Sequence, residues 1–171
     1  MITERPLPSD YEAYFGQYID LVPTGDLHQV YQTQMESVYA QIAGLSEREG
    51  EFRYADGKWS VKEIIGHLSD AERMFGYQIF CMARGYSAPI PPLNLAQCVI
   101  QGKFHLRPLR EILEEWKTVR QSTRSLIQTL THEDLRKTGV ARSHPVTVLA
   151  AACIILGHVE HHMRILRARY L

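Results

Sequence analysis

The fold of this chain is decided by the segment VTVLAAACIILGHVEHHM, residues 146–163, close to the C-terminus. Residues 146–156 are almost entirely apolar with helical character, and three of the eight histidines follow within five residues. His158 and His162 are four residues apart, so on a helix they lie on one face, one turn above the other. This is the spacing with which one helix offers two imidazoles to a metal ion. A complete site would need a third ligand from elsewhere in the chain.

The composition is that of one ordinary globular domain. The chain has 171 residues, of which 45% are hydrophobic and 22% charged, enough for a sizeable core. The formal net charge is zero, so there is no basic field for a phosphate backbone and nucleic-acid binding is not expected. The N-terminal sequence lacks the pattern of a signal peptide, and the longest apolar run is too short to cross a bilayer. The three cysteines form no Cys-x-x-Cys motif. We therefore expect a cytoplasmic protein without a membrane segment.

Hydrophobic periodicity predicts four long amphipathic helices and no convincing strand. The predicted helices cover residues 26 to about 45, 60 to 85, 108 to about 130, and 145 to about 170. The last of them is expected to open with Pro145. Four such helices need a shared core, which argues for an all-α fold, a four-helix bundle with residues 1–171 as a single domain. An aromatic N-terminal arm precedes the bundle. A long connection with several prolines separates the second and third helices, and such connections are often binding loops or lids.

The clearest helix start is the sequence WSVKE, which begins at Trp59 and has the form of a capping box. Ser60 can accept a hydrogen bond from an unpaired backbone N–H, and Glu63 can reach back to the cap. Trp59 is placed to pack against Ile64 as a hydrophobic staple. His67 follows two turns into this helix, beside its apolar face.

His67 is the best candidate for the missing third ligand. In the last predicted helix, His158 and His162 share a stripe that faces the bundle, whereas His161 lies about 100° away and cannot easily share an ion. The other histidines lie near predicted helix ends or in loops: His28, His105, His132 and His144. The sequence therefore predicts a metal site of His67, His158 and His162 with at least one open position. The alternative is that these are ordinary core histidines.

The same residues make the chain resemble the DinB-like, or DinB/YfiT-like, family of candidate metalloenzymes. Residues 57–73 and 157–171 carry the resemblance, through the pattern W-S-x-x-E-x-x-x-H and a late H-x-x-x-H. Together the two motifs are fairly specific, whereas either alone is weak. The resemblance implies an antiparallel four-helix bundle, frequent dimers, and a divalent metal ion held by three histidines that match His67, His158 and His162. Zinc and nickel are the first candidates for the ion. Gln78 departs from the family pattern, because an arginine is expected there in close relatives.

The resemblance leaves several reactions open, since some relatives transfer a low-molecular-weight thiol to an electrophile and others isomerise with a thiol cofactor. Our first hypothesis is metal-dependent transfer of a small thiol to a small electrophile, the metal lowering the pKa of the thiol. A metal-dependent hydrolase is the first alternative, and its general base would have to come from Glu72, Glu160 or His161. Glu72, however, is expected to be a solvated surface residue. Further alternatives are a non-catalytic metal-binding stress protein and a purely structural bundle. The sequence assigns no catalytic residue.

Overall fold

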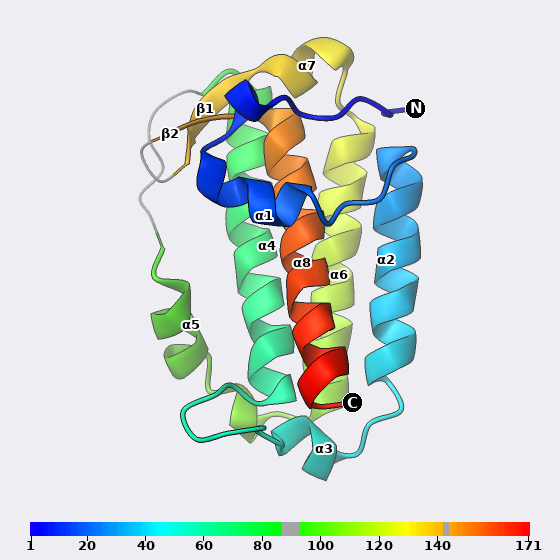
Figure 1. Cartoon of the computed structure of the whole chain (residues 1–171), viewed down its shortest axis with the longest axis vertical. Helices are drawn as coiled ribbons and strands as arrows, with labels where there is room; N and C mark the ends of the chain where they lie inside the picture. Colours follow the sequence, from blue (N-terminus) through cyan, green and yellow to red (C-terminus); the bar gives the residue numbers. More distant parts are fainter. Residues whose placement is uncertain (87–92, 142–143) are drawn as a thin grey trace.

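The computed structural model of the chain describes residues 1–86, 93–141 and 144–171. Its main body is a bundle of four long helices that stand side by side (Figure 1). These helices are α2 (Leu27–Ile42), α4 (Val61–Ala83), α6 (Leu109–Gln128) and α8 (Val148–Arg169). The predicted all-α fold, a four-helix bundle, is confirmed, and the described residues add one small hairpin of strands to it.

Two helices of the bundle run in each direction. In Figure 1, α2 and α8 run downwards and α4 and α6 run upwards. α4 packs against both α6 and α8, so it has one parallel and one antiparallel neighbour. Parallel neighbours cannot be joined by a short turn, because the chain must first return along the bundle. The long predicted connection between α4 and α6 makes this return, and the short helix α5 (Leu95–Gly102) lies along it.

The helix starts follow local chemistry. At the start of α4, the Ser60 hydroxyl accepts from the backbone N–H of Glu63 at 3.3 Å, and the Glu63 carboxylate accepts from the Ser60 N–H at 2.7 Å. The predicted capping box is therefore present. At the start of α8, the Thr147 hydroxyl accepts from the backbone N–H of Ala150 at 3.1 Å. Both helices that carry the candidate histidines thus have a fixed first turn.

The start of α8 corrects the prediction that Pro145 opens this helix. Residues 144–147 form strand β2 (His144–Thr147), which pairs antiparallel with β1 (Thr138–Ala141). The helix begins only at Val148, because the preceding residues are extended and belong to this hairpin. The sequence predicted no strand here, and the hairpin closes the end of the bundle beside Met82, whose side chain contacts Gly139.

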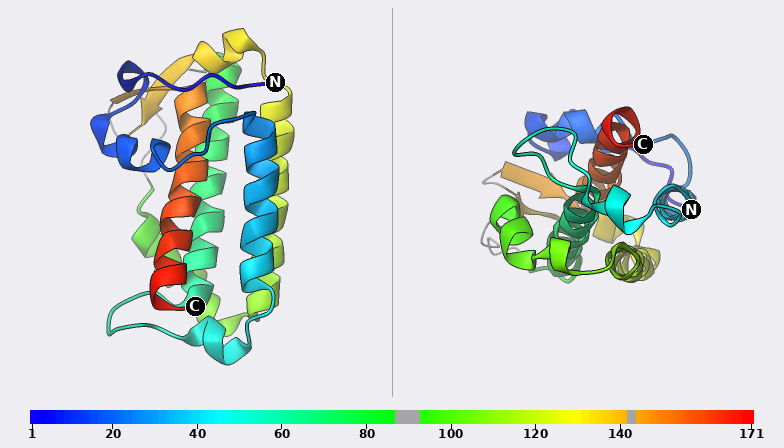
Figure 2. Two further views of the ribbon diagram at one scale, coloured as in Figure 1. Left: turned by 45° about the vertical axis from the view of Figure 1, so that its right-hand side comes forward. Right: turned by 90° about the horizontal axis from the view of Figure 1, so that it is seen from below.

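The N-terminal arm folds into short helical turns that lie across α8 (Figures 1 and 2). These are η1 (Pro8–Asp10), η2 (Ala13–Phe15) and α1 (Gly16–Ile19). The arm approaches α8 at Gly157, where a Cβ atom would lie 1.9 Å from the carbonyl oxygen of Tyr18. Only a glycine permits this approach. The arm is therefore seated directly on the backbone of the helix that carries two of the candidate ligands.

The remaining short elements are α3 (Glu47–Glu51), η3 (Phe104–Leu106) and α7 (His132–Arg136). Among the described residues, no helix combines the length and the apolar character needed to cross a membrane.

The hydrophobic core is divided into two clusters along the bundle. On α4, the lower cluster extends up to Leu68 and the upper cluster begins at Phe75. On α8, the upper cluster extends to Leu156 and the lower cluster begins at Val159. The residues between these limits form a level of the bundle that is rich in buried polar side chains. His158 lies between these limits, and His67 and His162 lie within one turn of them, at the edge of the lower cluster.

Candidate metal centre

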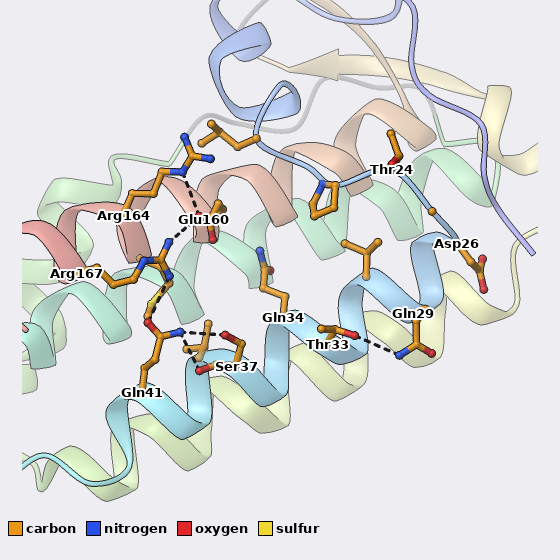
Figure 3. A pocket seen from close by; sticks show the side chains of 16 residues that line it. Thr24, Asp26, Gln29, Thr33, Gln34, Ser37, Gln41, Glu160, Arg164 and Arg167 are labelled. Carbon is orange, nitrogen blue, oxygen red and sulfur yellow. Dashed lines mark hydrogen bonds and ion pairs between the residues drawn. The ribbon is translucent and has the colours of Figure 1, made fainter.

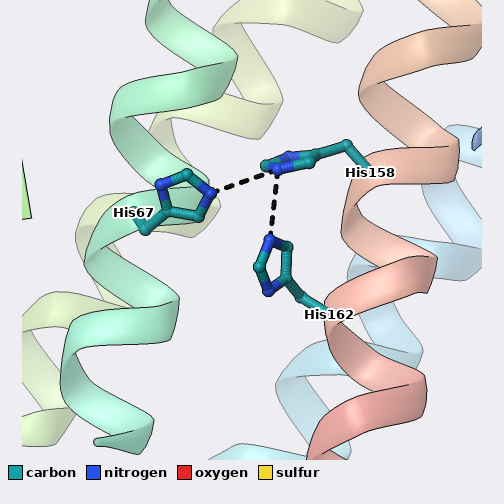
Figure 4. Close-up of side chains that lie close together, drawn as sticks. All are labelled: His67, His158 and His162. Atoms are coloured by element: carbon teal, nitrogen blue, oxygen red, sulfur yellow. Dashed lines mark hydrogen bonds between the residues drawn. The ribbon is translucent and has the colours of Figure 1, made fainter. Parts of the chain in front are cut away.

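The three histidines predicted as ligands converge on one point between α4 and α8 (Figure 4). Nε2 of His158 lies 3.1 Å from Nε2 of His67 and 3.2 Å from Nε2 of His162. Each of the three residues offers one ring nitrogen, and these nitrogens lie within 4.8 Å of one another. Two imidazoles from one helix and one from its antiparallel neighbour therefore meet, and their role as metal ligands stays a prediction.

This arrangement is poorly explained by hydrogen bonds alone. An imidazole nitrogen has a single in-plane position, which holds either a proton or a lone pair. Nε2 of His158 therefore cannot bond well to both His67 and His162 at once. A metal ion at the shared point would use one lone pair from each ring. Tetrahedral coordination at about 2.0–2.1 Å places ligand nitrogens roughly 3.3 Å apart, close to the two separations found here.

Burial keeps the three rings in the protonation state that a metal requires. His67 and His158 are buried and His162 is half-buried. Burial lowers the pKa of His67 to about 4, and it holds the pKa of His158 well below its usual value. The pKa of His162 falls to about 3, through burial and then through the neighbouring His67 and His161. Neutral imidazoles with free lone pairs therefore prevail at neutral pH.

Trp59 covers this group of histidines from the side of the loop before α4. Its ring centroid lies 4.7 Å from that of His67 and 6.4 Å from that of His162, with a nearly parallel stack on the latter. Trp59 also packs against the lower cluster, which contains Ile64, and the staple between these two side chains stays a prediction. The contact with the histidines was not predicted, although the position of Trp59 next to the cap of the ligand-bearing helix was a signal for it.

His161 lies outside the converging group, as predicted. Its ring packs edge-on against Tyr18 of the arm at a centroid distance of 5.5 Å, and Tyr18 makes a contact of the same kind with His158. The arm thus touches one candidate ligand directly and its neighbour as well. The contact of Tyr18 with these histidines was not predicted from the sequence, because it depends on the crossing of the arm over α8 at Gly157.

The outer nitrogen of His67 has no partner among the described residues. Its Nδ1 is buried and makes no hydrogen bond there. Metal-binding histidines commonly donate this second N–H to a carboxylate, a carbonyl or water. Here the ring is held by packing against Trp59 instead. By contrast, His132 is exposed and lies beside Glu4 on the surface.

The two carboxylates considered as general bases are both committed to arginines. Glu72 was expected to be solvated, but it is only 2% exposed and pairs with the fully buried Arg120, whose Nε lies 2.8 Å from one carboxylate oxygen and 3.0 Å from the other. Burial raises the pKa of Glu72. Glu160 accepts from Arg164 at 3.1 Å and from Arg167 at 2.6 Å. The expectation of a solvated Glu72 was wrong because the face of α4 that carries it packs against α6.

Two further features bear on the lining of the site. Gln78 is buried on the same face of α4 as His67, and its Oε1 makes no hydrogen bond to the described part of the chain. The connection with several prolines between the second and third predicted helices is expected to be a binding loop or a lid. Residues 87–92 lie outside the described part of the chain, so this expectation stays a prediction.

The family and the fold are established by comparison with known proteins. The model of the DinB superfamily matches residues 26–166. A protein of Oceanobacillus iheyensis described as a candidate metal-dependent hydrolase, OB0413, is 20% identical over 151 residues, which cover 86% of this chain and 87% of that protein. The solved structure of YfiT from Bacillus subtilis, described as a candidate metal-dependent hydrolase with an unusual four-helix bundle topology, is 15% identical. It matches with a TM-score of 0.73 over 96% of this chain and 93% of that one, which shows a common fold. This chain belongs to the DinB superfamily.

Proposed function

We propose that His67, His158 and His162 hold one divalent metal ion, and that the protein is a metal-dependent enzyme acting on a small molecule. The observation that carries this proposal is the convergence of three neutral imidazoles on one point. Buried histidines that serve only the core would each be paired with a separate partner. Here one Nε2 faces two others, an arrangement that an ion would satisfy and that hydrogen bonding would not.

The chemistry of such a centre follows from its ligands. A divalent ion held by three neutral imidazoles keeps its full charge and at least one open position, where it lowers the pKa of a bound water or thiol. The chain's own residues supply the setting. Burial keeps the ligands deprotonated, Trp59 packs against two of the rings, and Tyr18 packs against His158. Imidazole suits zinc and nickel alike, so both are proposed.

Hydrolysis is the reaction we propose first. Two similar proteins are described as candidate metal-dependent hydrolases, and the one whose structure is solved shares this fold. Activation of water at an ion does not require a neighbouring carboxylate, because the ion itself lowers the pKa of the water to near neutrality. The commitment of Glu72 and Glu160 to arginines is therefore compatible with a hydrolase.

Transfer of a small thiol, the first hypothesis from the sequence, is kept as the second candidate. The observation in its favour is that Glu72 and Glu160, the carboxylates considered as bases, are both engaged elsewhere. A thiol has a lower pKa than water and so depends less on a base. The predicted homodimer and the cytoplasmic location also stay predictions, and sedimentation velocity of the purified protein would check the first of them.

Metal content provides the first test. His67→Ala is expected to abolish stoichiometric binding of zinc or nickel, measured by elemental analysis after dialysis and by calorimetric titration of the chelator-treated protein. His161→Ala is the matched control, because His161 neighbours His162 but lies outside the converging group. Full metal content in the His67→Ala variant would overturn the proposed site. Loss of metal in the control alone would do the same.

Product analysis separates the two reactions. Metal-loaded protein is incubated with a panel of small esters, amides and electrophiles, with and without small thiols, and the products are identified by mass spectrometry. Cleavage without thiol supports hydrolysis, whereas thiol adducts that form only with metal support transfer. If the metal-loaded protein turns over none of them while its metal content is full, the non-catalytic metal-binding alternative is favoured and the proposed enzymatic function is contradicted.

A further inference from the structure

A cavity lies between α2 and α8 (Figure 3). Its volume is about 530 Å³, within the range of small-molecule binding sites. On a helix each residue advances by about 100°, so Met163 and Arg167 of this cavity lie roughly 100° and 140° around α8 from His162. The cavity therefore does not share the open side of the proposed metal centre.

One end of the cavity carries an excess of positive charge. Arg164 and Arg167 both donate to the same oxygen of Glu160, at 3.1 and 2.6 Å. Two guanidinium groups thus share one carboxylate, which leaves one positive charge uncompensated within this group. Arg167 also reaches the side-chain oxygen of Gln41 on α2 at 3.3 Å, which orients it across the cavity. Arginine pairs of this kind suit carboxylate and phosphate groups, which they bind through several donors.

The other end of the cavity carries a negative charge, that of Asp26. Asp26 also lines the cavity, and its carboxylate accepts from the backbone N–H of Ile2 at 2.8 Å. That hydrogen bond lowers the pKa of Asp26 and keeps it ionised. Asp26 and Gln41 are fifteen residues apart along α2, which corresponds to roughly 22 Å. An anionic group would therefore be drawn to the arginine end and away from Asp26.

The surface between the two ends is largely apolar. Val30 of α2 is half-buried and supplies accessible apolar surface, whereas Val38 and Met163 beneath it are already buried. Leu21 and Pro23 come from the segment that follows the arm. A ligand with an anionic head at the arginines could therefore lay an apolar body over this surface and remove it from water.

The side chain of Gln34, at the back of the cavity, is held in place by hydrogen bonds within the protein. Gln34 lines the cavity, donates its side-chain N–H to the carbonyl oxygen of Leu156 at 2.9 Å, and accepts from Arg120 at 2.9 Å. These bonds tie α2 to α8 and hold the two walls apart at a set distance. A cavity with fixed walls loses less conformational entropy on binding than one that must be formed.

We propose that this cavity is a second ligand site, which binds a small amphipathic anion. A carboxylate or a phosphate monoester contacts Arg164 and Arg167, and an apolar body lies over the accessible side chains of Leu21, Pro23 and Val30. This site is independent of the metal centre. The arginines require a negative charge on the ligand and the apolar surface requires an apolar body, so the two requirements can be tested separately.

Binding is measured by calorimetric titration of the purified full-length protein with octanoate and with octyl phosphate. 1-Octanol and octyltrimethylammonium, which share the apolar body but lack the negative charge, are the control ligands. Both anions are expected to bind, the one with the higher affinity identifying the preferred head group. The two controls are expected to bind at least tenfold more weakly. Equal affinity for the anions and for 1-octanol would overturn the proposal.

Two variants of the charged residues at the arginine end are expected to change the affinity for the anions in opposite directions. Arg167→Gln is expected to weaken binding of the anions about tenfold, whereas Glu160→Gln is expected to tighten it, because it frees the guanidinium groups that Glu160 now occupies. Arg169→Gln is the matched control, an exposed arginine on the same helix that does not line the cavity. The proposal fails if Glu160→Gln leaves affinity unchanged or lowers it, or if the control weakens binding as much as Arg167→Gln. Circular dichroism of each variant excludes unfolding as the cause.

Discussion

The ion pair between Glu72 and Arg120 lies in the middle of the bundle, and removing one of its charges should destabilise the protein strongly. Arg120 is fully buried, its guanidinium lies 4.8 Å from the ring centroid of Tyr31, and it bonds to both Glu72 and Gln34. Arg120→Met would leave the Glu72 carboxylate in the core without its counter-charge. Breaking a buried pair in this way costs about 3–5 kcal/mol, because the remaining charge is desolvated and unpaired.

The assay is unfolding of the chelator-treated protein, followed by circular dichroism at several pH values. For a chain of this length, a loss of 3–5 kcal/mol corresponds to a fall in Tm of roughly 10 °C. The variant should also become less stable as the pH rises. In this variant, the pKa of the buried Glu72 is higher in the folded state than its unfolded value of 4.5, so folding favours the neutral carboxyl group. The free energy of unfolding therefore falls as the pH rises from the unfolded pKa to the folded pKa, by up to about 1.4 kcal/mol per pH unit.

Two further variants separate the lost charge from the lost packing. Glu72→Gln combined with Arg120→Met removes both charges, and it is expected to recover most of the stability and to show no such dependence on pH. Arg110→Met, an exposed arginine on the same helix, should change stability by less than about 0.5 kcal/mol. A stability of Arg120→Met within about 1 kcal/mol of the wild type would contradict a large cost of the unpaired charge, and so would a double variant as unstable as the single one.

Two other predictions concern the histidine level and the arm. In the metal-free protein, the lowered pKa of His67 means that the folded state favours the neutral ring. The stability that this ring contributes is fully present above pH 6.5 and is lost as the pH falls towards about 4. Unfolding measured at acid pH should show this loss, and the loss should be smaller in His67→Ala. A loss of the same size in the variant would contradict the assignment. Gly157→Ala should destabilise the protein by about 1–3 kcal/mol despite the higher helix propensity of alanine, because the new Cβ would lie 1.9 Å from the Tyr18 carbonyl oxygen. Gly44→Ala is the control and should leave stability unchanged, because a Cβ atom there would lie in open space. Thermal unfolding of the two alanine variants decides this, and equal behaviour would disprove the steric argument.

Much of the bundle was predictable because its signals are local. Apolar periodicity located the four long helices, and the Ser60–Glu63 pair fixed the start of α4. With α4 and α8 both located, the relation of His158 to His162 was a matter of helical spacing. His67 could then be selected by elimination, since it was the remaining histidine in the middle of a helix. The structure brings these three side chains together.

The features that were missed depend on contacts between distant segments. The hairpin and the late start of α8 could not be inferred, because four-residue strands such as β2 carry little pattern and Pro145 is compatible with either a helix start or an outer strand. The burial of Glu72 was missed because a helical wheel gives the angle of a residue but not what covers it. α4 is covered by α6 on the side of Glu72 and by α8 on the side of His67.

The position of α4 connects these observations. A helix with two packed neighbours must bury two faces, and in the middle part of α4 each face carries a buried polar side chain, with His67 towards α8 and Glu72 towards α6. Apolar clusters above and below this part of the bundle supply the hydrophobic stabilisation. The buried charge of Glu72 is balanced within the protein by Arg120, so it needs no ion. Within residues 1–86, 93–141 and 144–171, no charged side chain pairs with the three histidines in this way, and this difference is why we propose the metal for the α8 side of α4 and a structural role for the α6 side.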